Sequence, residues 1–244
     1  KVAGGYYLKT TPKAVIIVGA DRDGTYYAAQ TLSQLVQGDR LPEVEITDWP
    51  DVPFRGSVEG FYGRVWTHQA RLSQIRFYGK YKLNTYIYAP KDDPYHRDKW
   101  RENYPPKKAD ELRELARVGA ENHVNVTWGL HLGDFNTNKK EEEKQHILSK
   151  LEFMHGLGFR SFAALFDDFG GADANLHAEI CNFITTEFLE KKKDCAPLVM
   201  CPNDYSGWGS SQYCKKLGER LHKDVRIMWT GRSICNDIDE KALA

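Results

Sequence analysis

The 244-residue sequence has no apolar run that approaches the roughly 20 residues of a membrane-spanning helix. It also lacks an excess of charge, because 34 basic residues balance 34 acidic ones. This balance gives no support for nucleic acid or an anionic membrane as the main partner. We therefore expect neither a nucleic-acid partner nor a membrane partner. The hydrophobic content of 41% is ordinary for a globular protein with a sizeable core.

Cysteines are few and poorly spaced for metal or disulfide chemistry. The five Cys all lie in the last third of the chain, and no two of them form a Cys-x-x-Cys pair. We expect no disulfide framework and no zinc site, although one bridge stays compatible with the sequence. Ser-x-x-Lys, Gly-x-Ser-x-Gly and His-Glu-x-x-His are also missing, which removes the usual serine-hydrolase and zinc-peptidase motifs. We expect no cofactor and no metal.

The start of the sequence carries no targeting information. The first residue is Lys1, and no signal-like segment follows it. We interpret the chain as an excised piece or a processed product of a longer protein. Its localisation is therefore open, whether secreted or periplasmic in a bacterium or cytoplasmic.

A proline-rich connector at residues 42–55 divides the chain. Its three prolines within fourteen residues favour a stiff extended segment over a helix. Before it, a β-branched run at residues 14–20 predicts a strand, and residues 24–36 predict a helix. We interpret residues 1–54 as the C-terminal remnant of a small α/β domain together with a linker.

After the connector, predicted strands and helices alternate regularly. The strands are expected at residues 56–62, 84–89, 124–131, 161–166, 198–201 and 225–229. The intervening helices are expected at residues 67–81, 107–122, 139–157, 173–193 and 211–221, and Asp237 is expected to cap a sixth. Such alternation predicts parallel strands joined by helical crossovers.

Two α/β folds fit this alternation. A doubly wound sheet usually carries a glycine-rich phosphate loop after its first strand, and no such loop occurs here. A TIM-type (β/α)8 barrel places its functional residues at the carboxyl ends of its strands. The predicted strands end in polar residues, among them Lys91, His131, Asp167 and Thr230. We therefore expect residues 55–244 to form such a barrel, truncated after about six units, with a C-terminal barrel segment missing after Ala244.

Two adjacent acids, Asp167 and Asp168, directly follow the fourth predicted strand of the barrel. Neighbouring carboxylates drive their pKa values apart, so one of them can stay protonated and act as an acid. The pair would also suit a surface turn, a helix cap or a Mg²⁺ site. The next strand ends offer Asn203, Asp204 and Thr230 rather than a cluster of carboxylates, which argues against the metal.

Other polar residues at strand ends allow two interpretations each. Lys91, Asp92 and Asp93 form either a solvated loop or a site in which Lys91 reaches a ligand. Tyr205 either donates its hydroxyl at the mouth of the barrel or simply packs there. His131 is expected to be a partly buried histidine with satisfied hydrogen bonds rather than a catalyst.

Five segments between residues 42 and 235 form a larger pattern. They are Val58-Glu59-Gly60-Phe61-Tyr62-Gly63, Asn84 to Asp93, Arg160-Ser161-Phe162-Ala163 leading into Phe166-Asp167-Asp168, Cys201-Pro202, and Met228-Trp229-Thr230-Gly231. In their order and spacing these segments resemble glycoside hydrolase family 84. That is the family of the O-GlcNAcases and related bacterial β-N-acetylglucosaminidases.

The resemblance implies a retaining enzyme that removes β-linked N-acetylglucosamine from a glycan or glycoprotein. In this family the 2-acetamido oxygen of the substrate attacks the anomeric carbon, which gives an oxazoline intermediate. The resemblance assigns Asp167 to the acetamido N–H and Asp168 to the general acid and base. It assigns substrate binding to Gly60, Tyr62, Lys91, Cys201, Tyr205 and Thr230.

The sequence departs from the family pattern at several positions. Asn203 and Asp204 stand where the family usually has Thr and Glu, and Leu132 stands where it usually has Pro. A non-catalytic carbohydrate-binding relative is the alternative function, although the intact Asp167–Asp168 pair argues against it. A metal-dependent lyase or aldolase barrel is disfavoured by the thin set of metal ligands.

Overall fold

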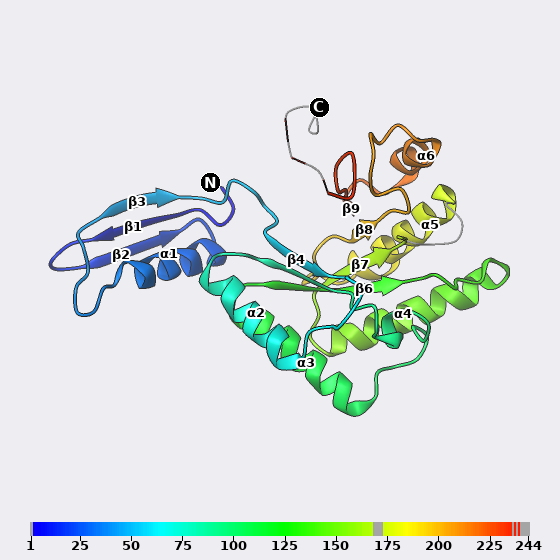
Figure 1. The fold of residues 1–244 in the computed structure, drawn as a ribbon, viewed down its shortest axis with the longest axis horizontal. Helices are drawn as coiled ribbons and strands as arrows, with labels where there is room; N and C mark the ends of the chain where they lie inside the picture. The colour runs from blue at the N-terminus through cyan, green and yellow to red at the C-terminus, as the bar shows by residue number, and fades with distance from the viewer. Residues whose placement is uncertain (1, 168–172, 236, 238, 240–244) are drawn as a thin grey trace. The chain divides into compact units, whose positions relative to one another are not determined.

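The structure is a computed structural model that describes residues 2–167, 173–235, 237 and 239 (Figure 1). It divides into two compact units. The first comprises Lys1–Ser57, Trp66–Tyr86 and Arg117–Asn125, and the second comprises Val58–Val65, Ile87–Ala116 and Val126–Ala244. Among the described helices, none combines the length and apolar character needed to cross a membrane.

The N-terminal segment forms a small antiparallel sheet covered by one helix (Figure 1). Its elements are β1 (Tyr6–Thr10), β2 (Val15–Gly19), α1 (Arg22–Leu35) and β3 (Glu45–Asp48), with the strand order β2-β1-β3. Side chains alternate across β1, so that Tyr6 and Leu8 are buried together with Tyr27 and Ala28 of α1. The segment therefore has a hydrophobic cluster of its own.

The expectation that residues 42–55 form only a connector is wrong for Glu45–Asp48. These residues pair antiparallel with β1, with Ile46 opposite Leu8. Ile46 packs against the buried cluster beside α1. The prolines of the segment all lie outside β3, so they break no ladder hydrogen bond.

The larger sheet has six strands in the order in which they occur along the chain. They are β4 (Gly56–Glu59), β5 (Thr85–Tyr88), β6 (Asn125–His131), β7 (Ser161–Leu165), β8 (Val199–Cys201) and β9 (Arg226–Ile227). The helices between them are α2 (His68–Lys80), α3 (Pro106–Glu121), α4 (Lys140–Gly156), α5 (Ala174–Ile184) and α6 (Gln212–Arg220). Short 3-10 helices occur at Pro94–His96 and Thr137–Lys139, and a π-helical turn at Thr185–Leu189 extends α5.

The strand order confirms the barrel architecture. Consecutive strands are neighbours throughout the sheet, and β6, β7, β8 and β9 pair in parallel. A doubly wound sheet would instead reverse its strand order at a switch point. The expected strands at residues 56–62 and 225–229 are shorter, ending at Glu59 and covering only Arg226–Ile227. The expected sixth helix after Asp237 lies outside the described residues.

Side chains of the central strands alternate between the barrel interior and the helices. Ala163 and Leu165 of β7 pack in the interior against Ala89, Val199 and Cys201. On the opposite side of β7, Phe162 meets Phe188 and Phe166 stacks on the ring of His177 in α5. This alternation decides which residue after β7 faces the interior.

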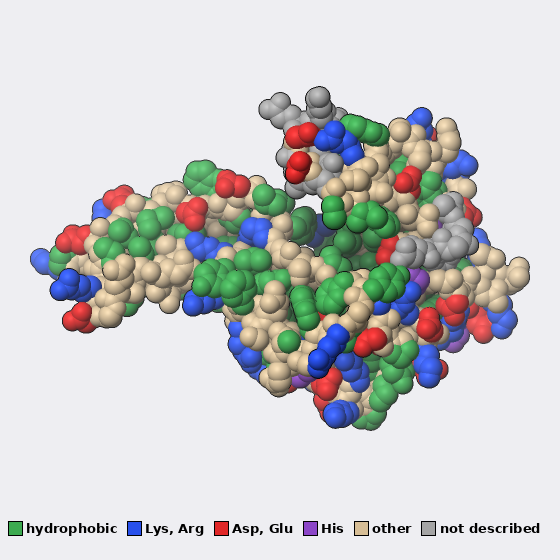
Figure 2. Space-filling view, viewed as in Figure 1, with side chains coloured by type: hydrophobic (Ala, Val, Ile, Leu, Met, Phe, Trp, Pro, Cys, Tyr) green, Lys and Arg blue, Asp and Glu red, His purple; other side chains and the backbone are tan. Residues whose placement is uncertain are grey.

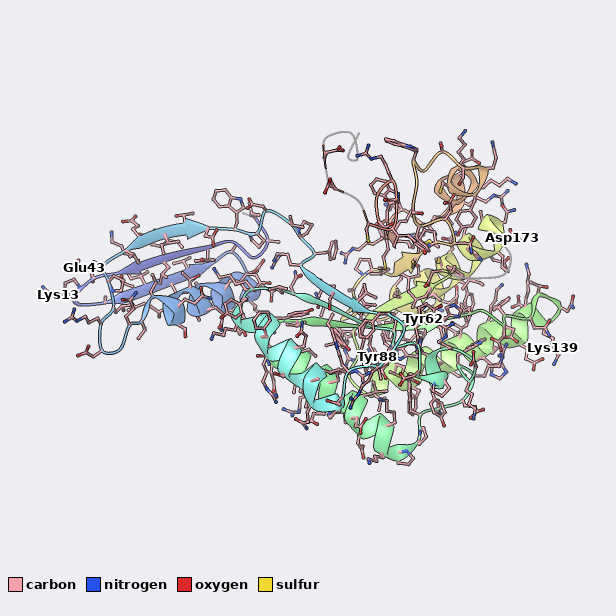
Figure 3. The ribbon with its side chains drawn as sticks, in the orientation of Figure 1. Lys13, Glu43, Tyr62, Tyr88, Lys139 and Asp173 are labelled. Atoms are coloured by element: carbon pink, nitrogen blue, oxygen red, sulfur yellow. The ribbon has the colours of Figure 1, made fainter. Side chains whose placement is uncertain are left out.

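Polar residues mark the starts of two of the helices. Asp173 caps α5, because its side chain accepts hydrogen bonds from the backbone N–H groups of Asn175 and Leu176 (Figure 3). Lys139 precedes α4, whose first turn holds Glu141, Glu142 and Glu143. Negative charge at this end stabilises a helix. On the face that Figure 2 shows, acidic and basic side chains of the described residues are interspersed without a large area of one sign.

Candidate active site

A pocket of about 270 Å³ lies where the strands of the larger sheet end, within the second unit. The residues that line it are Val58, Gly60, Ala89, Lys91, His96, Arg97, His131, Leu165, Asp167, Cys201, Tyr205, Met228 and Thr230. They follow or end strands β4 to β9, which is the usual position of active sites in barrel folds.

The pocket brings together most of the residues predicted from the sequence. Gly60, Lys91, Asp167, Cys201, Tyr205 and Thr230 all line it. Tyr62 does not line it and is 74% exposed, but its ring lies 5.2 Å from Nζ of Lys91. Asp168 lies outside the described residues.

Asp167 forms an ion pair with Lys91 inside the pocket. Nζ of Lys91 lies 3.2 Å from Oδ2 of Asp167, and both side chains are mostly buried. Asp167 continues the inward series of Ala163 and Leu165, since alternate residues share one face of a strand. Lys91 follows β5. Tyr88, the last residue of β5, is buried and does not line the pocket (Figure 3). The two charges therefore come from separate strand ends.

His131 supports the backbone beside Asp167. Its Nε2 lies 3.2 Å from the carbonyl oxygen of Asp167, and its Nδ1 accepts a hydrogen bond from the N–H of Gly133 at 3.3 Å. One neutral tautomer, protonated on Nε2, satisfies both contacts. Burial lowers the pKa of His131, and the positive charge of Arg97 lowers it further. The ring therefore favours its neutral form, and its Nε2 contact supports the strand end beside Asp167.

Backbone hydrogen bonds join the segments that carry Tyr205 and Thr230. The N–H of Thr230 donates to the carbonyl of Tyr205 at 2.9 Å, and its hydroxyl donates to the same oxygen at 3.3 Å. Two residues after Tyr205, the N–H of Gly207 donates to the carbonyl of Gly231 at 2.9 Å. These contacts place two predicted pocket residues side by side at the ends of β8 and β9.

The pocket also includes residues to which the sequence analysis assigned no role. His96 ends the short helix after β5 and Arg97 follows it, while Val58 and Met228 contribute apolar surface. Asp204 is not among the lining residues, because it lies against α6, where Sγ of Cys214 is 3.6 Å from its Oδ2. The inward alternation of β4 would have indicated Val58, but no periodic signal marks His96 or Arg97.

The arrangement suits polar recognition and charge stabilisation. It offers one carboxylate fixed by an ammonium group, a tyrosine hydroxyl, a threonine hydroxyl and a thiol around an apolar floor. In the described part of the chain, the potential metal ligands that gather in a group are His155, Asp194 and Cys195. None of these three lines the pocket.

Comparisons with known proteins agree with this arrangement. A family model described as beta-N-acetylglucosaminidase matches residues 55–244, and one described as glycosyl hydrolase family 20, domain 2, matches residues 2–49. Protein O-GlcNAcase of Rattus norvegicus is 34% identical over 194 residues, which cover 73% of this chain and 21% of that protein.

Solved structures extend the similarity to the fold. The structure of CpGH84B superposes with a TM-score of 0.92 at 38% identity and covers 97% of this chain. A mutant of the Thermobaculum terrenum O-GlcNAc hydrolase gives a TM-score of 0.71 at 30% identity over 75% of this chain. The chain spans 44% and 42% of these two structures and about a fifth of the curated relative.

Proposed function

The chain belongs to the β-N-acetylglucosaminidase family, glycoside hydrolase family 84, and we propose that it supplies catalytic and sugar-binding residues to an enzyme that removes β-linked N-acetylglucosamine. The observation that carries this proposal is the convergence of Asp167, Lys91, Tyr205 and Thr230 in one pocket at the strand ends. These residues lie far apart in the sequence. Their meeting in one pocket favours a site over a set of unrelated surface residues.

We propose that the chain has two domains. Residues 1–54 form a small α/β domain with a linker, and residues 55–244 form the catalytic barrel. Two observations support it. The family matches end at residue 49 and begin at residue 55, and β1–β3 with α1 have a separate hydrophobic cluster. Each candidate site residue then belongs to the barrel.

The proposed reaction is substrate-assisted hydrolysis with retention of configuration. The acetamido oxygen of the substrate forms a bond to the anomeric carbon while the bond from that carbon to the leaving oxygen breaks. Asp168 gives its proton to the leaving oxygen, in the role that the family resemblance assigns to it. Water then attacks the oxazoline, Asp168 takes a proton from it, and the acetamido group is restored.

Asp167 is proposed to accept the acetamido N–H and to stabilise the positive charge that develops on the oxazoline. Its fixed carboxylate suits this role, because a preorganised charge needs no reorientation in the transition state. Tyr205 is proposed to donate to the acetamido oxygen. Gly60 and Lys91 are proposed to hold sugar hydroxyls, while Tyr62, Cys201 and Thr230 line the pocket and its rim.

The proposed substrate is a glycan or glycoprotein that ends in β-linked N-acetylglucosamine. The apolar and polar lining of the pocket suits a single sugar ring with one acetamido group. The balanced charge of the sequence supports neither nucleic acid nor a membrane as a partner.

Hydrolysis of a chromogenic aryl β-N-acetylglucosaminide by the whole protein tests the proposal. We expect release of the aryl group, unchanged by a chelator, and no release from the corresponding α-anomer. Activity lost on chelation would indicate a metal-dependent reaction instead. Tight sugar binding without hydrolysis would indicate a non-catalytic carbohydrate-binding relative.

A further inference from the structure

The turn that carries Lys91 is closed around a single backbone oxygen. The carbonyl of Pro90 accepts a hydrogen bond from the N–H of Asp93 at 3.0 Å and from Nε2 of His96 at 2.9 Å. Lys91 is the first residue inside this turn, and its ammonium group reaches Asp167. Whatever fixes the turn therefore also fixes the backbone from which the Lys91 side chain reaches Asp167.

Asp93 ties the turn to the surrounding structure. Its carboxylate accepts hydrogen bonds from the hydroxyl of Tyr88 at 2.5 Å, the hydroxyl of Tyr104 at 3.0 Å and the N–H of Tyr95 at 2.9 Å. The side chain is buried, whereas the adjacent Asp92 is exposed. Hydrogen bonds to a charged acceptor are about twice as strong as neutral ones, so these three donors hold Asp93 firmly.

A buried ammonium group also contacts Tyr104. Nζ of Lys150, in α4, is 4.5 Å from the centre of the Tyr104 ring and donates to the carbonyl of Glu102 at 2.5 Å. Its side chain is 1% exposed. Nε1 of Trp128 donates to the hydroxyl of Tyr104 at 3.1 Å, which helps to fix the position of this side chain.

The buried charges of Asp93 and Lys150 compensate each other. Burial lowers the pKa of Lys150 to about 8, and the negative charge of Asp93 opposes this change. Lys150 therefore stays charged at pH 7, where an isolated buried carboxylate at Asp93 would be costly. The charged and titratable groups that face this network from neighbouring segments include Tyr95, His96, Glu102 and Lys108.

We propose that Asp93 and Lys150 are positioning residues, a buried charge pair bridged by Tyr104 that holds the Lys91 turn against Asp167. The inference rests on the proposed function, in which Lys91 binds a sugar hydroxyl. Neither Asp93 nor Lys150 lines the pocket, so both act through Lys91. Supporting residues of this kind commonly control how precisely a contact residue is held.

The first test compares Asp93→Asn with its matched control Asp92→Asn in the whole protein. Asp93→Asn should lower kcat/KM for the aryl β-N-acetylglucosaminide by about 10- to 100-fold, as expected for a misplaced contact residue. Asp92→Asn should leave it unchanged. The decisive variant combines Asp93→Asn with Lys91→Ala, and it should be no worse than Lys91→Ala alone.

A merely structural role gives a different result. If Asp93 only stabilised the fold, its effect and that of Lys91→Ala would multiply in the double variant, which would overturn the inference. Lys150→Met combined with Lys91→Ala should likewise be no worse than Lys91→Ala alone. If Asp93→Asn does not fold, Tyr88→Phe removes one donor from the carboxylate and should show a smaller loss with the same coupling.

A second readout does not depend on activity. Competitive acetylation of the chain's lysines, followed by mass spectrometry, measures how fast each amine is labelled. For Lys91 this rate reports how well the ion pair with Asp167 protects the amine. The Lys91 peptide should be labelled several-fold faster in Asp93→Asn and at the original rate in Asp92→Asn. Unchanged labelling would contradict the positioning role even in an inactive protein, whereas missing hydrolysis by the unmodified protein would contradict only the proposed function.

Discussion

Lys91 and Asp167 meet across a strand to which neither belongs. Lys91 follows β5 and Asp167 follows β7, and β6 lies between these strands in the sheet. Their charged groups nevertheless approach to 3.2 Å. His131, at the end of the intervening β6, contacts the backbone carbonyl of Asp167 through its Nε2. The carboxylate of Asp167 is therefore compensated by an opposite charge within the pocket.

Lys91→Met should weaken both sugar binding and catalysis. The variant removes the ammonium group while keeping an apolar side chain of similar length. A hydrogen bond to a charged group contributes roughly 1.5–3 kcal/mol, which corresponds to a loss of about 10- to 150-fold in kcat/KM. The measurement is steady-state kinetics of the whole protein on the aryl β-N-acetylglucosaminide.

Lys99→Met provides the matched control for this variant. Lys99 lies in the same segment, but its side chain is exposed and it does not line the pocket. Its kinetics should equal those of the unmodified protein. Equal losses from both substitutions would mean that general charge, rather than the ion pair with Asp167, matters for activity.

Acid should destabilise the fold through two buried histidines. Burial lowers the pKa of His96 and of His177 from 6.5 to about 4 each. The unfolded chain therefore binds more protons than the folded one between these values, so stability falls as the pH drops below 6.5. At pH 5 the loss should be roughly 2 kcal/mol for each histidine.

Urea unfolding of the chain at pH 7 and pH 5 measures this loss. His96→Gln should flatten the pH dependence, since glutamine does not titrate. His146→Gln is the control, because His146 lies partly exposed on α4 and should leave the slope unchanged. An unaltered slope in His96→Gln would show that the acid sensitivity arises elsewhere.

The thiols should differ widely in reactivity. All five cysteines are free, Cys235 is exposed and Cys181 is fully buried. Burial raises the pKa of Cys181 far above its usual range and that of Cys195 to about 11. Because the thiolate is the reactive form, Cys235 should be alkylated first at pH 8 and Cys181 only after unfolding. Mass spectrometry of timed samples checks this order, and early labelling of Cys181 would contradict its burial.

The regular part of the fold could be predicted from the sequence because its periodicity is strong. The helix expected at residues 67–81 is α2, with Thr67 as its cap, and the strand expected at residues 161–166 is β7. β1 and β3 were missed for a physical reason. Each is a short strand without a clear alternation of polar and apolar residues, and its pairing is decided by packing against α1, which lies elsewhere in the chain.

The candidate site could be predicted where a strand end alone reveals it. Asp167 and Lys91 follow apolar strands, and strand ends converge in a barrel. Asp92 and Asp93 show the limit of this reasoning. They are identical neighbours, yet one is exposed and the other is buried among three hydrogen-bond donors. The difference arises from Tyr88 and Tyr104, whose meeting with Asp93 depends on the tertiary structure.

The two adjacent aspartates should respond differently to the leaving group. Asp168→Ala removes the proposed general acid, whose help is typically worth about 10²- to 10⁴-fold. Substrates with poor leaving groups should lose activity by this factor, whereas an activated aryl glycoside departs with little help from a proton. Asp167→Asn should instead depress good and poor substrates by similar factors, because in the proposed mechanism the acetamido group takes part with every aglycone.

A leaving-group series measured as kcat/KM separates the two roles, and an inhibitor gives an independent check. Asp167→Asn keeps the shape of a side chain that Lys91 holds in the pocket but removes its charge. An oxazoline-mimicking inhibitor should therefore bind more weakly to Asp167→Asn, since a charge-assisted hydrogen bond is lost. Removing Asp168 should flatten the alkaline limb of the pH profile, where the acid loses its proton. A steep leaving-group dependence in Asp167→Asn alone would reverse the two assignments, and losses of only a few-fold in both variants would mean that the pair is not catalytic.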